Sequence, residues 1–458
     1  MEEVLSGIKP SSAEEAKLSE LAEDLSAALR EFLKGSNIIN VSVEGSFAKG
    51  TWLRNSPEID IFIQYSPETK REILEKEALE AGRRVITGLG GSFRLRHAEH
   101  PYVEGFIDNV RINIVPCYHV EPTRIISAVD RTPYHTLYVK SRISARQRDE
   151  VRLLKALLKA ANLYGAEIRI GGFSGYLCEL LIIKFETLQN LLNSVVRWKP
   201  PVVVRIEEDM PTRNELLKLF PNSPLIVPDP VDYLRNVASA ITRQKLAEFI
   251  LLAKLFTRKP SIKFFITINN IINVSEVAGR SFLIILLPLK RDKPPDVIWG
   301  ELKSSARGIE RALVNKKIEV WRWDVWSDEK NKAVIMYELA SNELPRIYLH
   351  QGPEVYREQA LNFIDRHLGS KTSVAGPWIW GDRLYVVKRR EEVKVDEILR
   401  KMLTSGEIKI AHGLKKEFDE CKIITNLEEL YRLVNEEKDL MTFVRRFLCG
   451  RPSLLQEQ

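Results

Sequence analysis

The chain has 458 residues, of which 44% are hydrophobic and 29% are charged, and its formal net charge is +7. This composition excludes a disordered or fibrous chain, and the length predicts roughly three domains. The acidic N-terminus and the short, proline-interrupted apolar runs predict neither a signal peptide nor a membrane span. Four widely spaced cysteines indicate free thiols in a cytoplasmic protein rather than a zinc site, and the mild basic excess permits RNA binding without demonstrating it.

The N-terminal segment predicts a helix followed by two strands. We expect the helix to begin at Ser12 with a capping box to Glu15 and to end near Gly35. Residues 38–44 are largely β-branched and apolar, and residues 58–65 begin with a strict alternation of polar or aromatic and aliphatic side chains. Both segments are therefore typical of strands.

The turn between these strands and the acids that follow it form the first candidate site. Glu58 and Asp60 lie two residues apart on a strand, so their carboxylates share one face. Neighbouring carboxylates repel each other, so the pair predicts a bound cation, and such hard oxygen ligands suit Mg²⁺. Gly45, Ser46 and Gly50 predict a turn whose N–H groups and hydroxyl cradle phosphate. Cation and phosphate together predict a nucleotide site.

The sequence up to about residue 260 predicts the rest of a mixed sheet and then a helical region. We expect a helix at 68–89, strands at 93–99, 102–106 and 110–115, helices at 149–165, 175–195 and 239–256, and a loop rich in proline and aspartate at 223–236. In the strand at 110–115, Asn113 shares a face with Arg111, whereas Asp108 is an odd number of positions away and would point to the other face.

Beyond residue 260 the predicted order is strand, helix, strand, strand, helix, strand, at 281–289, 297–315, 318–325, 333–339, 354–368 and 384–388. This order indicates a ferredoxin-like domain. Trp321, Trp323 and Trp326 either stack on bases or cover a sheet, and the alternation of the first two favours covering a sheet. The basic residues of the last stretch either form a solvated face or contact phosphate; they are Arg389, Arg390, Arg400, Lys401, Lys415, Lys416, Arg445 and Arg446.

We therefore predict an α+β protein with four regions. These are a head with a mixed sheet at 1–140, a helical neck at 141–260, a ferredoxin-like body at 261–390 and a basic helical tail at 391–458.

The Gly-Ser turn, followed about a dozen residues later by an acid-x-acid strand, resembles the signature of the DNA polymerase beta-like nucleotidyltransferases. Residues 98–103, 128–135, 150–155, 164–167, 172–176 and 229–232 are similar to motifs of the archaeal, class I CCA-adding tRNA nucleotidyltransferases. The resemblance covers the first half of the chain. It implies an enzyme that adds or repairs the 3′-terminal CCA of tRNA from CTP and ATP with Mg²⁺, releases pyrophosphate and acts as a homodimer. It also implies that residues 1–140 are the catalytic head, that the neck at 141–260 binds the nucleotide and the primer end, and that the body at 261–390 binds RNA.

The resemblance also implies a role for individual residues. Glu58 and Asp60 would hold the metal ions, and Arg235 would help to choose between C and A. The other matching positions contact the nucleotide, mostly through its phosphates: Ser46, Lys49, His135, Lys155 and Tyr164. Three of these roles have a structural alternative. The acids would then lie on the solvent-exposed face of a strand, His135 would be a packed surface histidine, and Arg235 would be a surface charge at the start of a helix.

Asn113 departs from the family pattern, which implies a third carboxylate at this position. An asparagine can ligate a metal weakly through its oxygen but cannot act as a base, and loss of a base typically costs about 10²- to 10⁴-fold in rate. Three explanations stay open: an engineered trap of the pre-reactive complex, a paralogue retired from catalysis, and an active enzyme with an unusual metal site. The alternative functions are a protein that only binds the tRNA acceptor end and a poly(A) or oligo(A) synthesising enzyme that accepts ATP alone.

Overall fold

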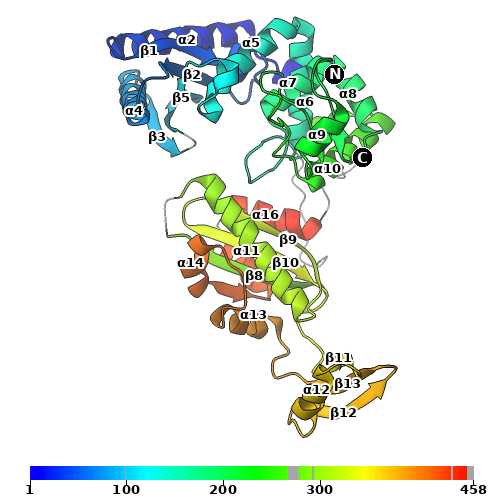
Figure 1. Cartoon of the computed structure of the whole chain (residues 1–458). Helices are drawn as coiled ribbons and strands as arrows, with labels where there is room; N and C mark the ends of the chain where they lie inside the picture. Colours follow the sequence, from blue (N-terminus) through cyan, green and yellow to red (C-terminus); the bar gives the residue numbers. More distant parts are fainter. Residues whose placement is uncertain (98–99, 267–276, 278, 291–292, 435–436, 451–458) are drawn as a thin grey trace. The chain divides into compact units, whose positions relative to one another are not determined.

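The computed structural model describes residues 1–97, 100–266, 277, 279–290, 293–434 and 437–450. The chain divides into two compact units, residues 1–268 and 269–450, each with its own sheets and helices (Figure 1). This mixture of helices and mixed or antiparallel sheets confirms the predicted α+β class. Within the described residues, no helix is both long and apolar enough to cross a membrane.

The first unit contains a five-stranded sheet in the order β1-β2-β5-β4-β3. Its strands are β1 (Ile38–Glu44), β2 (Glu58–Tyr65), β3 (Ser92–His97), β4 (Pro101–Ile107) and β5 (Val110–Tyr118). β2 and β5 are parallel, and the other neighbours are antiparallel. All five strands were predicted, although residues 98–99 of the expected third strand lie outside the described residues.

Helices α2 (Ser12–Phe32) and α4 (Arg71–Gly88) pack against one face of this sheet. Alternate residues of β2, including Ile59 and Ile61, are fully buried in the core beneath these helices. Because side chains alternate along a strand, Glu58 and Asp60 lie on the opposite face. The core thus fixes the side of the sheet on which the acids stand.

Three local features differ from the expected ones. The helix does begin at Ser12, but its capping box joins Ser11 to Glu14, because Ser11 has the extended backbone of an N-cap. The expected turn at Gly45 is a single helical turn, α3 (Gly45–Ala48). The expected helix at 175–195 is two helices, since Glu186 has a φ of +68° that interrupts the helical backbone.

Helices with a shared apolar core complete the first unit. They are α1 (Glu2–Ile8), α5 (Thr132–Arg142), α6 (Ala145–Ala160), α7 (Gly175–Phe185), α8 (Leu188–Val195), α9 (Arg213–Leu219) and α10 (Arg243–Arg258), beside the short parallel pair β6 (Val202–Val203) and β7 (Leu225–Ile226). Helix α5 was not predicted, because it buries only Thr136 and Val139 and so has almost no apolar period.

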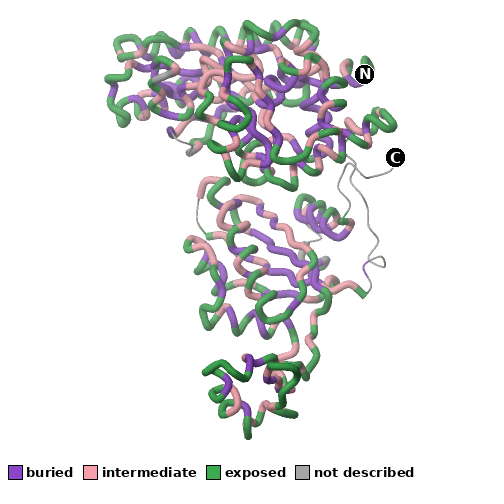
Figure 2. Tube along the Cα trace, turned by 45° about the vertical axis from the view of Figure 1, so that its right-hand side comes forward, coloured by how far each residue is buried: buried purple, intermediate pink, exposed green. Residues whose placement is uncertain are grey.

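The second unit is built on a four-stranded antiparallel sheet in the order β14-β8-β10-β9. Its strands are β8 (Ser281–Pro288), β9 (Val320–Ser327), β10 (Lys332–Leu339) and β14 (Lys422–Ile424). Helices α11 (Pro295–Asn315) and α13 (Val395–Thr404) pack on one face, whereas α15 (Leu427–Val434) and α16 (Lys438–Cys449) pack on the other. The central strands between these layers are buried (Figure 2). Trp323 faces the first layer and Trp326 the second, and Trp321 is largely exposed.

The last helix and strand of the expected ferredoxin-like order were assigned wrongly. Helix α12 (Gln359–His367) and strand β13 (Arg383–Arg389) belong to a separate three-stranded sheet, with β11 (Ile347–Glu354) and β12 (Ser373–Trp380). The ferredoxin-like sheet is instead completed by α13 and β14. The physical reason is that alternation specifies which face of a strand is buried but not which sheet it joins. Residues 451–458 and 267–276, which fall in the expected tail and body, lie outside the described residues.

Candidate active site

Glu58, Asp60 and Asn113 meet on the face of the head sheet that α2 and α4 leave uncovered. Asp60 of β2 is the direct neighbour of Asn113 in β5, and Glu58 is the neighbour of Arg111. The side-chain amide nitrogen of Asn113 donates to Glu58 Oε1 at 2.6 Å and to Asp60 Oδ1 at 2.8 Å. Arg111 forms an ion pair with the second oxygen of Glu58 at 2.5 Å. The acids therefore stand side by side, bridged by two N–H donors.

The electrostatics of Asp60 are those of a site that lacks positive charge. Burial and the neighbouring carboxylate of Glu58 raise the pKa of Asp60 to about 7, although hydrogen bonding from Asn113 and the charges of Arg111 and Lys49 act in the opposite direction. A carboxyl group with such a pKa is only partly ionised at neutral pH, and a bound cation would favour its ionised form. The pair is thus suited to a divalent ion.

The donor set fits Mg²⁺ only with the help of Asn113. Within the described residues, no cluster of three or more His, Cys, Asp or Glu side chains is arranged to hold a metal ion. The side-chain oxygen of Asn113 is buried and has no hydrogen-bond partner in the described part of the chain. Half a turn of the amide would exchange this oxygen with the nitrogen that now bridges the acids. Two carboxylates and one amide oxygen then make an all-oxygen set of the kind that Mg²⁺ prefers.

Gly45 brings the phosphate-cradling turn directly against Asp60. Its φ is +71°, and a Cβ at this position would overlap the carboxylate of Asp60. Only glycine satisfies both conditions without strain. Ser46, the next residue, accepts a backbone hydrogen bond from Thr51 at 2.9 Å, which closes the loop that follows α3. The expected turn therefore lies beside the acids.

Lys49 and Lys155 converge on Glu179, an acid in the apolar helix α7. Glu179 lies 2.5 Å from Lys49 Nζ and 3.6 Å from Lys155 Nζ, and it accepts a hydrogen bond from Thr51 at 2.5 Å. Burial alone would raise the pKa of Glu179, but the two lysines outweigh burial and lower it. Sequence reasoning missed Glu179, although an acid within the apolar run Leu177–Ile182 was a usable signal.

Tyr164 lies beside Lys155 at the start of α7. A Cβ on Gly175 would be 3.1 Å from the Tyr164 hydroxyl and 3.7 Å from Lys155 Nζ, so both side chains approach the backbone of Gly175. The ammonium of Lys159 lies 5.4 Å from the centre of the Tyr164 ring. Burial raises the pKa of Tyr164, so its phenol keeps its proton at neutral pH and can donate to an anion.

His135 and Arg235 share one buried acceptor, Asp229. Its Oδ2 lies 2.8 Å from His135 Nε2 and 2.8 Å from Arg235 Nη1, while its Oδ1 accepts from the Tyr176 hydroxyl at 3.0 Å. The rings of His135 and Tyr176 are stacked 4.0 Å apart. Burial lowers the pKa of His135, although Asp229 acts in the opposite direction, so the imidazole is neutral at pH 7. Sequence reasoning gave no role to Asp229 or Tyr176.

The three groups of residues form one continuous site. The ammonium of Lys49 lies 5.5 Å from the centre of the Tyr176 ring, which links the Glu179 cluster to the Asp229 cluster. The backbone N–H of Lys49 also donates to the carbonyl oxygen of Gly45 at 3.3 Å, and Gly45 lies against Asp60, which links both clusters to the acid pair. Every candidate residue thus lies in the first unit, in the head sheet or in the helices and loops packed beside it. The arrangement offers a cation site, anion-binding cations and a base-sized aromatic cluster.

Comparison with known proteins gives a consistent result along the whole chain. Three family models match: a nucleotidyltransferase domain at residues 23–135, the second domain of tRNA nucleotidyltransferases at 149–266 and the C-terminal domain of CCA-adding enzymes at 280–425. The CCA-adding enzyme of Saccharolobus shibatae is 36% identical over 97% of this chain and 98% of its own length. That of Pyrobaculum islandicum is 34% identical over 89% and 94%. Among solved structures, the Cid1 poly(U) polymerase is 14% identical, with a TM-score of 0.46, over 58% of this chain and 97% of that one.

Proposed function

Because the chain belongs to the archaeal CCA-adding tRNA nucleotidyltransferases, we propose that it adds or repairs the 3′-terminal CCA of tRNA, using CTP and ATP, at the site around Glu58 and Asp60. The observation that carries this proposal is the hydrogen-bonded group of Glu58, Asp60 and Asn113 beside the Gly45 turn. Nucleotidyl transfer needs a divalent cation and a place for the triphosphate, and the acid pair beside the glycine turn supports the proposal that both bind here.

Each cluster has one task in this proposal. Glu58, Asp60 and the oxygen of Asn113 would hold Mg²⁺, which when bound would lower the pKa of the attacking hydroxyl and neutralise the triphosphate. Lys49 and Lys155 supply point charges to the phosphates, and Tyr164 donates its phenolic proton to them.

The base is recognised at the other end of the site. The His135–Tyr176 stack offers a flat surface and Arg235 offers directional donors, all fixed by Asp229. We infer that Arg235 thereby helps to select C and A, and that Ser46 contacts the phosphates from the first turn of α3.

Asn113 makes this a slow enzyme in our proposal. An amide cannot accept the proton of the attacking hydroxyl, and it holds a cation less strongly than a carboxylate does. Binding of nucleotide and tRNA does not depend on that proton. We therefore expect the affinities for nucleotide and tRNA to equal those of an enzyme with a carboxylate at position 113, and the transfer step to be about 10²- to 10⁴-fold slower.

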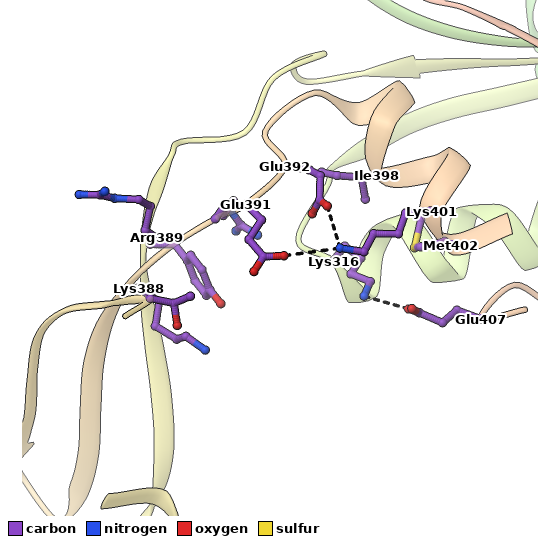
Figure 3. A pocket seen from close by; sticks show the side chains of 12 residues that line it. Lys316, Lys388, Arg389, Glu391, Glu392, Ile398, Lys401, Met402 and Glu407 are labelled. Carbon is purple, nitrogen blue, oxygen red and sulfur yellow. Dashed lines mark hydrogen bonds and ion pairs between the residues drawn. The ribbon is translucent and has the colours of Figure 1, made fainter. Parts of the chain in front are cut away.

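The second unit offers a basic hollow for the RNA backbone (Figure 3). The charged residues that line this cavity of 310 Å³ are five basic and three acidic side chains: Lys316, Lys388, Arg389, Arg390, Lys401, Glu391, Glu392 and Glu407. Lys401 is partly neutralised by Glu392 at 2.7 Å, and Arg390 stacks on the ring of Tyr348 at 4.1 Å. Stacked arginines and lysines are typical contacts of phosphate groups. The proposal also includes a homodimer and a cytoplasmic location; the thiols of Cys117, Cys178 and Cys421, which form no disulfide, agree with that location.

A labelling assay separates the proposed function from its two alternatives. A tRNA that lacks its terminal trinucleotide is incubated with labelled CTP alone, with labelled ATP alone, or with CTP followed by labelled ATP. The proposal predicts slow addition of two C residues followed by one A. Incorporation of A without prior C would show an ATP-only polymerase. Binding without any incorporation, both here and in Asn113→Asp, would show an acceptor-end binding protein.

A further inference from the structure

Glu104 stands in the same row of side chains as Asp60 and Asn113. In β5, Asn113 is the direct neighbour of Asp60 in β2 on one side and of Glu104 in β4 on the other. Residues opposite each other on neighbouring strands point to the same face, and neighbouring strands are about 4.8 Å apart. The three side chains therefore project in one row from the face that carries the candidate site, with Asn113 in the middle.

The carboxylate of Glu104 is buried, and its two oxygens face different ways. Its side chain is 3% exposed. Oε2 accepts from the Nε atoms of Arg94 and Arg96, the latter at 3.0 Å, whereas Oε1 faces Nη1 of Arg111 at 3.9 Å. The other nitrogen of that guanidinium, Nη2, pairs with Glu58. Arg111 thus lies between Glu104 and the acid pair, at a place that both acids make attractive to positive charge.

A purely structural role would be the neutralisation of three arginines by one glutamate. That role does not explain why the glutamate lies next to the position where the site lacks a charge. Arg94 is half exposed and can be solvated by water, so the sheet does not need a buried acid for its sake. Asn113 instead lies between two acids, Asp60 and Glu104, and its buried side-chain oxygen has no hydrogen-bond partner within the described residues.

We propose that Glu104 supports the cation site from β4 as an outer acid, beyond the residues that would hold the ion, and supplies the negative charge that Asn113 does not supply from β5. Magnesium keeps several of its waters in protein sites, so Glu104 would act on the ion through such a water. Arg111, which pairs with both acids, would leave Glu58 to make room for the cation. This inference rests on the proposed function only in requiring that the site hold a divalent cation.

Manganese binding to the full-length protein tests the proposal without any catalytic turnover. Free Mn²⁺ is measured by electron paramagnetic resonance for the parent, Glu104→Gln, Asn113→Asp and the double variant. We expect Glu104→Gln to weaken Mn²⁺ binding about tenfold in the parent, and by less than about twofold in the Asn113→Asp background, where position 113 supplies the charge. Equal effects in the two backgrounds would mean that Glu104 only balances its arginines, and would overturn the proposal.

Arg94→Gln gives a second test that survives if Glu104→Gln does not fold. Removal of this arginine leaves Glu104 less neutralised, so Mn²⁺ binds more tightly if Glu104 serves the cation site. Unchanged or weaker binding would contradict that role.

The tRNA assay separates a failure of this inference from a failure of the proposed function. If Asn113→Asp adds CMP while the Mn²⁺ effects are simply additive, then Glu104 has no part in the cation site and the proposed function stands. If neither the parent nor Asn113→Asp adds CMP at saturating Mg²⁺, the proposed function fails whatever the Mn²⁺ titrations give.

Discussion

Gly45 couples a backbone requirement to the chemistry of the site at a single residue. Its φ is positive, and any side chain would overlap Asp60. In Gly45→Ala, Asp60 must move away from the new methyl group. Because misplacement of a catalytic group by about 1 Å can lower the rate about 10²-fold, we predict that the transfer rate falls by at least about 10²-fold. Single-turnover rates of CMP addition measure this loss.

The matched control is Gly90→Ala, where φ is +76° but the new methyl group has open space around it. It should lose about 1 kcal/mol of stability and no activity. Similar activity losses in both variants would contradict the account.

Glu179 holds the two candidate phosphate-binding lysines in place. Glu179→Gln leaves Lys49 and Lys155 buried without a counter-charge, so we predict a loss of about 3 kcal/mol in the free energy of unfolding and a higher KM for ATP. Urea titration and steady-state kinetics measure the two effects. Because the folded state lowers the pKa of Glu179, its stabilisation is present above the unfolded pKa of about 4.3 and is lost as the pH falls through the lower folded value. The difference between parent and variant should therefore shrink below about pH 4.3.

The control for this prediction is an acid and a base that meet on the surface. In Glu80→Gln the exposed pair with Arg84 is lost, which should cost less than about 1 kcal/mol and leave KM unchanged. If both substitutions had the same effect on unfolding, the buried cluster would contribute no more than an ordinary surface pair.

At the scale of single residues, the sequence predicts which side chains carry charge but not which of them meet. The spacing of Glu58 and Asp60 is enough to place both on one face, because the strand period is local. The links through Glu179 and Asp229 join positions about 130 and about 90 residues apart, and no local period contains them. The motif resemblance brought in Lys155, Tyr164 and His135 without stating what holds them.

The loop between β7 and α10 acts as one element that presents Arg235. Asn236 ties it to Val227 and Leu225, and Asp229 ties it to His135 and Tyr176. In Asp229→Asn, Arg235 and His135 lose a charged acceptor. We predict at least a tenfold rise in KM for both CTP and ATP and weaker discrimination against UTP and GTP, measured by competition between nucleotides.

A second acid in the same loop provides the control. The carboxylate of Asp232 pairs with Arg131 at 2.9 Å and, among the described interactions of the chain, forms no hydrogen bond or ion pair with His135 or Arg235. Its contact with Arg235 is a backbone hydrogen bond, which Asp232→Asn keeps. Asp232→Asn should therefore leave nucleotide selection unchanged. A loss of discrimination in Asp232→Asn equal to that in Asp229→Asn would mean that the loop as a whole, rather than the Asp229 cluster, sets selection.

At the scale of elements, the predictions are best where a period is strong and weakest where an element's partner is distant. β1 and β2 have the expected bounds, since their apolar pattern and flanking turns are local. Strand β13 was assigned to the wrong sheet. Leu384 and Val386 alternate with less buried residues in the small sheet, and a strand of the larger sheet would show the same alternation. The break at Glu186 and the helix α5 lack a clear signal in the sequence.

At the scale of the molecule, catalysis and RNA binding are expected to reside in different units. The acid pair and the nucleotide clusters lie in the first unit, and the basic hollow of Lys388 and Arg389 lies in the second. We predict that the double substitution Lys388→Ala and Arg389→Ala weakens tRNA binding about tenfold at physiological salt. The slope of log K against log salt concentration should become less steep by about two, as expected for the loss of two phosphate contacts, and KM for ATP should not change. Filter binding at several salt concentrations measures this.

An equal change of charge at a remote surface is the control for that effect. Lys17 and Lys34 are exposed on and just beyond α2, on the side of the head sheet away from the acids. Their joint replacement by alanine should leave the salt dependence of tRNA binding as it is. If both double variants weakened binding alike, net charge rather than the hollow would account for it.

The rate of CMP addition to tRNA lacking CCA, in the parent and in Asn113→Asp, tests the proposed transfer site most directly. Each protein is mixed in excess with such a tRNA, labelled CTP and saturating Mg²⁺, and single-turnover rates are compared. A site that works through Glu58, Asp60 and position 113 predicts measurable addition by the parent and a rate about 10²- to 10⁴-fold higher in the variant. Equal rates, or no addition by either protein, would contradict it.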